Sequence, residues 1–120
     1  MDRMTSIFKA LSDRNRLRAV SALMQYDELC ACQITELLQV TGATASRHMG
    51  VLISAGLVRS RKDGRWVNYR LIREDPALSR IVEWIGDSLG EDETAAKDRA
   101  RLNHITACDR EALCRKQKRR

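Results

Sequence analysis

The sequence has few of the residues that interrupt or stiffen a chain. Its 120 residues include one proline, six glycines, two tryptophans, two tyrosines and one phenylalanine. It has no run of about 18 apolar residues, which excludes a transmembrane helix. Its first residues contain no uninterrupted apolar stretch of the kind found in secretory signals. We therefore expect a cytoplasmic protein with no membrane partner, and at about 150 residues per domain the length suits one main domain.

Catalytic signatures are also missing. The sequence contains no Cys-x-x-Cys redox pair, no glycine-rich nucleotide loop and no Ser-His-Asp set. We therefore expect a binding protein rather than an enzyme, with no required cofactor. Its four cysteines, in a compartment that keeps thiols reduced, indicate ligands or sensors rather than structural disulfides.

Positive charge is concentrated in one segment. The net charge of the whole chain is +6. Residues 1–42 are balanced, whereas residues 43–73 carry +6, residues 74–108 carry −4 and the last twelve residues carry +4. A basic block between neutral and acidic ones is typical of a localised polyanion-binding face. The alternative interpretation is a solvated basic surface.

Apolar spacing predicts a mainly helical chain with one hairpin. Ser12 or Asp13 can cap a second helix, Thr41 can cap a fourth helix that ends near Gly56, and Pro76 opens a fifth. The predicted helices carry apolar stripes over Met4–Leu11, Leu17–Met24, Ile34–Leu38, Ala45–Ile53 and Leu78–Leu89. Two predicted strands, residues 57–61 and 65–71, flank Asp63-Gly64, a dipeptide that favours a type I′ turn.

This order of elements predicts a winged helix-turn-helix, a mainly α fold with a β-hairpin wing. In such a unit the second helix of the motif enters the major groove and the hairpin lies along the DNA backbone. The residues expected to contact double-stranded DNA are Thr44, Ser46, Arg47 and His48 of the helix and Arg59, Arg61, Lys62 and Arg65 of the hairpin. His48 is equally consistent with a boundary histidine that packs and makes one hydrogen bond. Trp66 and Tyr69 are expected to support the hairpin rather than to stack on bases.

We divide the chain at its change of composition. Residues 1–90 form the predicted DNA-binding and dimerisation domain, and residues 91–120 form a charged helical extension or tail with a frayed end at 115–120. The first helix and the Pro76–Gly90 helix carry apolar stripes that so small a core does not need on both sides, and such stripes mark an interface. We therefore expect a homodimer through these two helices.

Three segments of the sequence resemble a known family. The run Glu28-Leu29-Cys30-Ala31-Cys32 is similar to the ELCxC signature of the ArsR/SmtB repressors, which are metal- and metalloid-responsive winged-helix regulators. Residues 44–49 resemble their recognition helix, and residues 8–13 resemble their opening segment. The resemblance implies a homodimer that occupies operator DNA when ligand-free and leaves it when metal binds.

The cysteine spacing agrees with a soft ligand. Closely spaced thiolates select soft ions, but residues two apart on a regular helix point about 200° from each other. Cys30 and Cys32 can therefore share one ion only if this stretch is an irregular entry into the third helix. The alternative is that both are small buried hydrophobic residues.

The chain also departs from the family patterns. In arsenic-responsive members a third cysteine lies three residues beyond the second, where this chain has Thr35. The histidines of the family's zinc site are missing between Pro76 and Gly90. A further thiolate must then come from Cys108 or Cys114.

We assign that ligand to Cys108, with Cys114 as the alternate. On a continuous tail helix, Cys108 lies about 90° and Cys114 about 150° from the centre of the apolar side. A flexible tail could deliver either sulfur, or both. The expected inducer is arsenite, with antimonite or another soft metal ion as further ligands. The rival hypotheses are a cadmium- or lead-responsive repressor and a thiol-redox repressor of the same fold.

Overall fold

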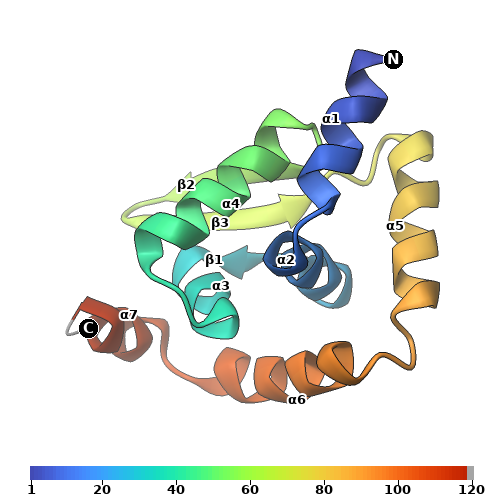
Figure 1. Ribbon diagram of the computed structural model, residues 1–120. Coiled ribbons are helices and arrows are strands. Elements are labelled where there is room, and N and C mark those ends of the chain that lie inside the picture. Colours follow the sequence, from blue (N-terminus) through green and yellow to red (C-terminus); the bar gives the residue numbers. More distant parts are fainter. Residues whose placement is uncertain (119–120) are drawn as a thin grey trace.

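The computed structural model describes residues 1–118 as seven helices around a small antiparallel sheet (Figure 1). The first helices, α1 to α4, and the short strand β1 have these bounds: α1 Asp2–Leu11, α2 Arg14–Gln25, β1 Leu29–Cys30, α3 Ala31–Leu38 and α4 Gly42–Ser54. The remaining elements are β2 Val58–Asp63, β3 Trp66–Leu71, α5 Pro76–Ser88, α6 Glu93–Ala107 and α7 Arg110–Lys118. Residues 1–90 are called the body below, and residues 91–118 the extension.

The core of the body lies where α2, α3 and α4 meet the sheet. Each helix turns its apolar stripe inward, and the side chains of Leu23, Ile34 and Leu52 are fully buried there. Asp13 is the N-cap of α2 and accepts a hydrogen bond from the Arg16 N–H at 3.0 Å. This confirms Asp13 as the cap of the predicted second helix.

The helix-turn-helix of α3 and α4 is fixed by its turn. Gln39 ends α3 in the left-handed region with φ 55°, and the Thr41 hydroxyl accepts from the Thr44 N–H at 3.2 Å at the start of α4. Gly56 follows α4 with φ +79°, a conformation that favours glycine. The predicted cap at Thr41 and the predicted helix end near Gly56 are both confirmed.

The sheet has one more strand than the sequence indicated. Its order is β1-β3-β2, with both pairs antiparallel, so β3 is central and β1 adds a third strand of two residues. Asp63 pairs with Trp66, so the loop residues are Gly64 and Arg65. Of these two loop residues, only Gly64 has a positive φ, of 60°. The predicted type I′ turn at Asp63-Gly64 is therefore wrong, because one glycine supplies the single positive φ of a type II′ pattern.

Helix α5 begins as predicted and divides its apolar residues between two faces. Pro76 lies at its start, after the N-cap Asp75. Leu78 and Ile85 pack into the body's own core, which the expectation of a wholly exposed stripe missed. The apolar side chains that remain exposed on α1 and α5 are Met4, Phe8 and Trp84.

The extension packs along α2 and α3 (Figure 1). It is not one helix, because α6 ends at Ala107 and α7 begins at Arg110, with Cys108 in extended conformation between them. Asp98 of α6 is buried and forms a two-pronged ion pair with Arg18 of α2, with N···O distances of 2.9 and 3.0 Å. Helix α7 continues to Lys118. The predicted fraying is therefore wrong for residues 115–118. Arg119 and Arg120 lie outside the described residues.

Within residues 1–118, no helix is both long enough and apolar enough to span a bilayer.

Candidate nucleic-acid interface and thiol site

Helix α4 presents one basic side chain outward from a buried apolar face. Ala45, Met49 and Leu52 face the core, and Arg47 is exposed on the opposite side. Arg47 makes no ion pair with any described residue. An exposed, unpaired guanidinium on the second helix of the motif suits a base edge or a phosphate.

The three polar residues beside Arg47 differ in their surroundings. The Thr44 hydroxyl accepts from the Thr41 hydroxyl at 3.0 Å. Ser46 is exposed, and its hydroxyl is hydrogen-bonded to that of Tyr69. Burial raises the pKa of Tyr69, and this hydrogen bond offsets part of the rise. The Thr44 hydroxyl therefore contacts the N-cap of its own helix, whereas Ser46 connects α4 to β3.

His48 points toward α2. Its side chain is only 12% exposed, and its Nδ1 lies 3.2 Å from Nη1 of Arg16. The Nδ1 atom is also 3.9 Å from the Asp13 carboxylate. This burial and this contact agree with the boundary histidine that the sequence left open as an alternative, and a DNA contact of His48 stays a prediction.

The cations of the wing are mostly paired with carboxylates of the same chain. Arg59 contacts Glu74 at 3.4 Å, and Arg61 contacts Glu28 at 2.6 Å. The hydrogen bond from Arg61 lowers the pKa of the Glu28 carboxyl below its ordinary value. Of the two other wing residues expected to contact DNA, Arg65 pairs with Glu111 of α7, and Lys62 has no ion-pair partner among the described residues.

Cys30 and Cys32 lie on different elements. Cys30 ends β1, is the N-cap of α3 and is 1% exposed. Its N–H donates to Oε1 of Gln33 at 2.9 Å. Cys32 is half-buried in the first turn of α3. The expected irregular entry is therefore present as a strand-to-helix junction between the two cysteines.

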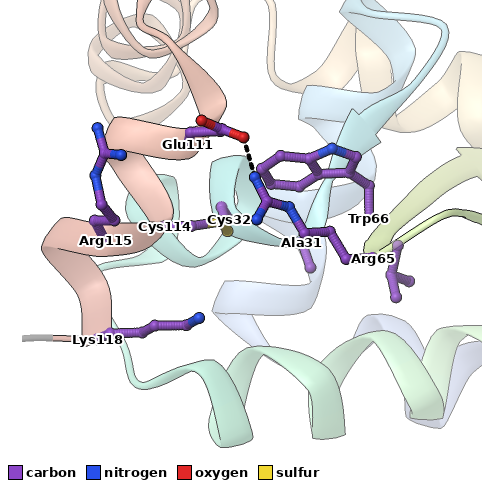
Figure 2. Close-up of a pocket in the computed structure, with 9 residues that line it drawn as sticks. Ala31, Cys32, Arg65, Trp66, Glu111, Cys114, Arg115 and Lys118 are labelled. Atoms are coloured by element: carbon purple, nitrogen blue, oxygen red, sulfur yellow. Dashed lines mark hydrogen bonds and ion pairs between the residues drawn. A yellow bond between two sulfur atoms is a disulfide. The ribbon is translucent and has the colours of Figure 1, made fainter.

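Cys32 is joined to Cys114 of α7 by a disulfide, with a Cα–Cα distance of 5.7 Å (Figure 2). The expectation that Cys108 would lie nearer to this site, with Cys114 toward solvent, is wrong. It assumed one continuous tail helix, whereas the break after Ala107 turns α7 onto α3. Cys108 is exposed at the end of α6, and its thiol donates to the His104 carbonyl at 3.3 Å.

A cavity of about 290 Å³ opens beside the Cys32–Cys114 pair (Figure 2). Trp66 and Val67 of the wing form one wall, and Arg115 and Lys118 of α7 lie on the other side. Within residues 1–118, no group of three or more His, Cys, Asp or Glu side chains is assembled to hold a metal. The structure thus brings two sulfurs together next to a basic opening.

Several contacts of the extension were missed by the sequence analysis. The Gln117 amide donates to the Cys32 carbonyl at 2.7 Å, and Lys116 lies 3.3 Å from the buried Glu36 carboxylate. Two signals could have indicated a separate last helix: Asp109 is a favoured N-cap type, and Leu113 and Gln117 have helical i, i+4 spacing. No local signal indicates that this helix docks on α3.

Comparisons with known proteins place the fold in one family. The model of the family described as bacterial regulatory protein, arsR family, matches residues 13–60. The chain is 46% identical over 65 residues to the cadmium resistance transcriptional regulatory protein CadC of Listeria innocua, covering 54% of this chain and 55% of that protein. It therefore spans only about half the length of this relative.

Two further proteins match more of their length. The arsenic resistance transcriptional regulator ArsR2 of Pseudomonas putida is 39% identical over 91 residues, covering 68% of this chain and 79% of that protein. The homodimeric winged helix-turn-helix domain Mb0332 of Mycobacterium bovis superposes with a TM-score of 0.64 at 26% identity, covering 77% of this chain and 82% of that one. With its helix-turn-helix, its wing and these matches, the chain belongs to the arsR family of bacterial regulatory proteins, which are DNA-binding regulators and not enzymes.

Proposed function

We propose that this protein is a metalloid-responsive transcriptional repressor. It binds double-stranded operator DNA as a homodimer and is released when arsenite or antimonite binds its cysteine thiolates. The observation that carries the proposal is the contact between Cys32 of α3 and Cys114 of α7. Helix α3 directly precedes α4, whose outer face carries the exposed Arg47. Relatives named for arsenic and cadmium resistance support the same conclusion.

The DNA contact rests on α4 and the wing. Arg47 is positioned to contact a base edge, with Thr44 and Ser46 beside it and His48 holding α4 against α2. The wing supplies phosphate contacts through four cations: Arg59, Arg61, Lys62 and Arg65. Because three of these cations already pair with carboxylates, DNA binding must exchange an internal ion pair for a phosphate contact.

The dimer rests on the exposed apolar residues of α1 and α5. Phe8 is 53% exposed and Trp84 is 65% exposed. Aromatic side chains are enriched at protein interfaces, and they are otherwise costly to leave in water. A two-fold axis through these helices gives paired α4 helices and therefore calls for a palindromic operator.

The inducer site rests on thiolates of two elements. Trivalent arsenic exchanges its hydroxyl groups for sulfur ligands: each thiol that forms an As–S bond gives its proton to the departing hydroxyl group, which leaves as water. In the reduced protein Cys32 and Cys114 supply two sulfurs, and Cys30, two residues before Cys32, supplies the third after a local opening of the α3 entry. Cys108 remains a weaker proposal as ligand, because it is exposed at the end of α6. Cadmium or lead could use the same thiolates, which select soft ions generally.

The disulfide favours a second candidate, a thiol-redox repressor. A low-molecular-weight disulfide RSSR would oxidise the two protein thiols to the Cys32–Cys114 bond and leave as two RSH. The basic residues Arg115 and Lys118 beside the pair favour thiolates and hence exchange. In this case DNA release would follow oxidation without any metal.

One titration separates these candidates. The fully reduced protein is bound to a duplex that it selects from random-sequence DNA, and arsenite, cadmium, lead or oxidised glutathione is added in parallel. Release by arsenite at the lowest concentration supports the first proposal, and release only by oxidised glutathione supports the second. Serine variants of each cysteine then assign the ligands. Loss of the arsenite response in Cys108→Ser but not in Cys114→Ser would contradict the assignment of Cys114.

A further inference from the structure

Helix α7 contacts the wing as well as α3. Arg65, at the turn between β2 and β3, forms an ion pair with Glu111 in the first turn of α7 (Figure 2). The neighbouring Arg110 lies over the Trp66 ring at 4.9 Å from its centroid, and Arg65 lies at the same distance from that ring. The start of α7 thus holds the tip of the wing by two adjacent residues.

The attachment of α7 to the body depends on its polar and sulfur contacts. Of its nine residues only Leu113 is buried, and a helix of this length is marginal by itself in water. The other contacts to α3 are the Cys32–Cys114 bond, the hydrogen bond from Gln117 to the Cys32 carbonyl, and the contacts of Lys116 and Gln117 with the Glu36 carboxylate, each at 3.3 Å. Cys114 follows Glu111 by three residues, so the two lie on the same side of the helix. Joining Cys114 to Cys32 therefore places Glu111 opposite Arg65.

A carboxylate and a phosphate compete for the same guanidinium. Both accept the paired N–H groups of an arginine, and one arginine cannot satisfy both fully at the same time. The pairs Arg59–Glu74 and Arg61–Glu28 lie wholly within the body and do not depend on α7. Arg65 is thus the wing cation whose partner is brought by the extension.

We infer that Glu111 is an internal competitor for DNA phosphate and couples the thiol site to the wing. When Cys32 and Cys114 are joined, by a shared soft ligand or by a disulfide, α7 is held on α3 and Glu111 occupies Arg65. When the sulfurs are separate, α7 loosens and Arg65 is free for the DNA backbone. The inference rests on the proposed DNA-binding function, and it assigns Glu111 as a positioning residue that touches neither inducer nor DNA.

The test compares the reduced protein with the Cys32–Cys114-linked protein, both as the full chain carrying Cys108→Ser, which removes the exposed free thiol. Linking uses oxidised glutathione, which gains the two hydrogens of the protein thiols and leaves as two molecules of glutathione. Affinity is measured over a range of salt concentrations for a duplex selected by the reduced protein and for a random-sequence duplex. Because phosphate contacts do not depend on the DNA sequence, the contribution of Arg65 should be measurable on both duplexes.

Linking is expected to weaken binding about tenfold and to reduce the salt slope by about one for each protomer, which is the slope of one lost phosphate contact. In Glu111→Gln, the linked protein should regain most of that affinity and slope, while the reduced protein stays unchanged. In Arg65→Ala, the reduced protein should already bind weakly, and linking should change little more. Glu28→Gln, which removes a carboxylate of the body from the wing, is the matched control and should leave the effect of linking intact.

The inference is overturned if linked Glu111→Gln binds as weakly, and with the same salt slope, as the linked protein with Glu111. It is also overturned if Arg65→Ala leaves the effect of linking undiminished. Failure of the proposed function has a different result: the reduced protein then prefers no DNA sequence, although the Glu111 effect on the random-sequence duplex persists.

Discussion

The body and the extension differ in what they contribute. The body carries Arg47 outward on α4 and leaves it without an ion pair among the described residues. The extension carries side chains that engage groups of the body: Asp98 pairs with Arg18, Glu111 with Arg65, and Cys114 with Cys32. We propose that the DNA contacts lie in the body and that the response needs groups of both parts, because Cys32 of the body joins Cys114 of the extension. Variants of α4 should therefore lose binding, and variants of the extension should lose the response.

The largest effect is expected from Trp84→Glu in the body. A charge at this 65% exposed position on α5 should prevent dimerisation, because it would be buried in the proposed interface. A monomer holds one half-site, so affinity for the selected duplex should fall about a thousandfold. Sedimentation gives the oligomeric state, and Asp87→Ala, also exposed on α5, is the control. A dimeric Trp84→Glu protein would show that the interface lies elsewhere.

The next effect is expected from Asp98→Ala in the extension. The side chains of Arg18 and Asp98 are 17% and 10% exposed, so removing the carboxylate leaves a mostly buried guanidinium without its counter-charge. The free energy of unfolding should fall by about 3 kcal/mol. The inducer response should also weaken, because α6 precedes α7 in the chain and positions it on the body. Chemical denaturation measures the first effect.

The matched control for Asp98→Ala is Glu93→Ala on the same helix. Glu93 forms an exposed pair with Lys97 at 3.6 Å, and such pairs contribute little to stability. We expect no measurable change in this variant. Equal destabilisation by both changes would contradict the role given to the buried pair.

A smaller effect on binding is expected from Arg47→Ala. If Arg47 makes a bidentate base contact, its loss should cost about 1–3 kcal/mol of operator affinity and relax specificity at one position. Because the side chain is exposed, the thermal midpoint should stay nearly unchanged. Fluorescence anisotropy with the selected duplex measures the affinity, and Arg80→Ala on α5 is the control. Unchanged affinity in Arg47→Ala would show that this face of α4 does not contact DNA.

The smallest effect is expected from Glu28→Gln, which removes the nearer of the two carboxylates paired with Arg61 and leaves Asp63 at 4.0 Å. Affinity for DNA should rise a few-fold in the reduced and the linked protein alike, whereas Glu111→Gln should raise it only in the linked protein. The pKa of Glu28 is lowered from 4.5 by the hydrogen bond from Arg61. The pair therefore stabilises the fold above pH 4.5 and ceases to do so as the pH falls through the lowered pKa. Denaturation at several pH values should show that the protein with Glu28 loses its stability advantage over Glu28→Gln as the pH falls.

The elements of the body could be predicted from local sequence signals. Asp13 and Thr41 cap helices through their own side chains, and Pro76 and Gly56 fix the backbone near helix ends. Each of these signals acts over a few residues, so the sequence shows it directly. Strand β1 could not be predicted in the same way, because two residues are too few to show a period.

The contacts of the extension could not be predicted, because they join residues that are far apart in sequence. Cys32 and Cys114 are separated by 82 residues, and periodicity along one helix says nothing about where that helix docks. The expected positions of Cys108 and Cys114 were wrong for this reason: they were measured as angles on a continuous helix, whereas the chain turns between Ala107 and Arg110. The charge pattern likewise predicted a DNA contact for Arg65, but it did not show that Glu111 forms an ion pair with this residue.

We propose above that the extension completes the thiol site with Cys114. The most direct test is the ultraviolet absorption of the reduced protein as arsenite is added, because thiolate-to-arsenic bands report the number and type of sulfur ligands. We expect a band that saturates at one arsenic per chain, is lost or strongly reduced in Cys32→Ser and Cys114→Ser, and is unchanged in Cys108→Ser. An unchanged band in Cys114→Ser, with loss in Cys108→Ser, would contradict it.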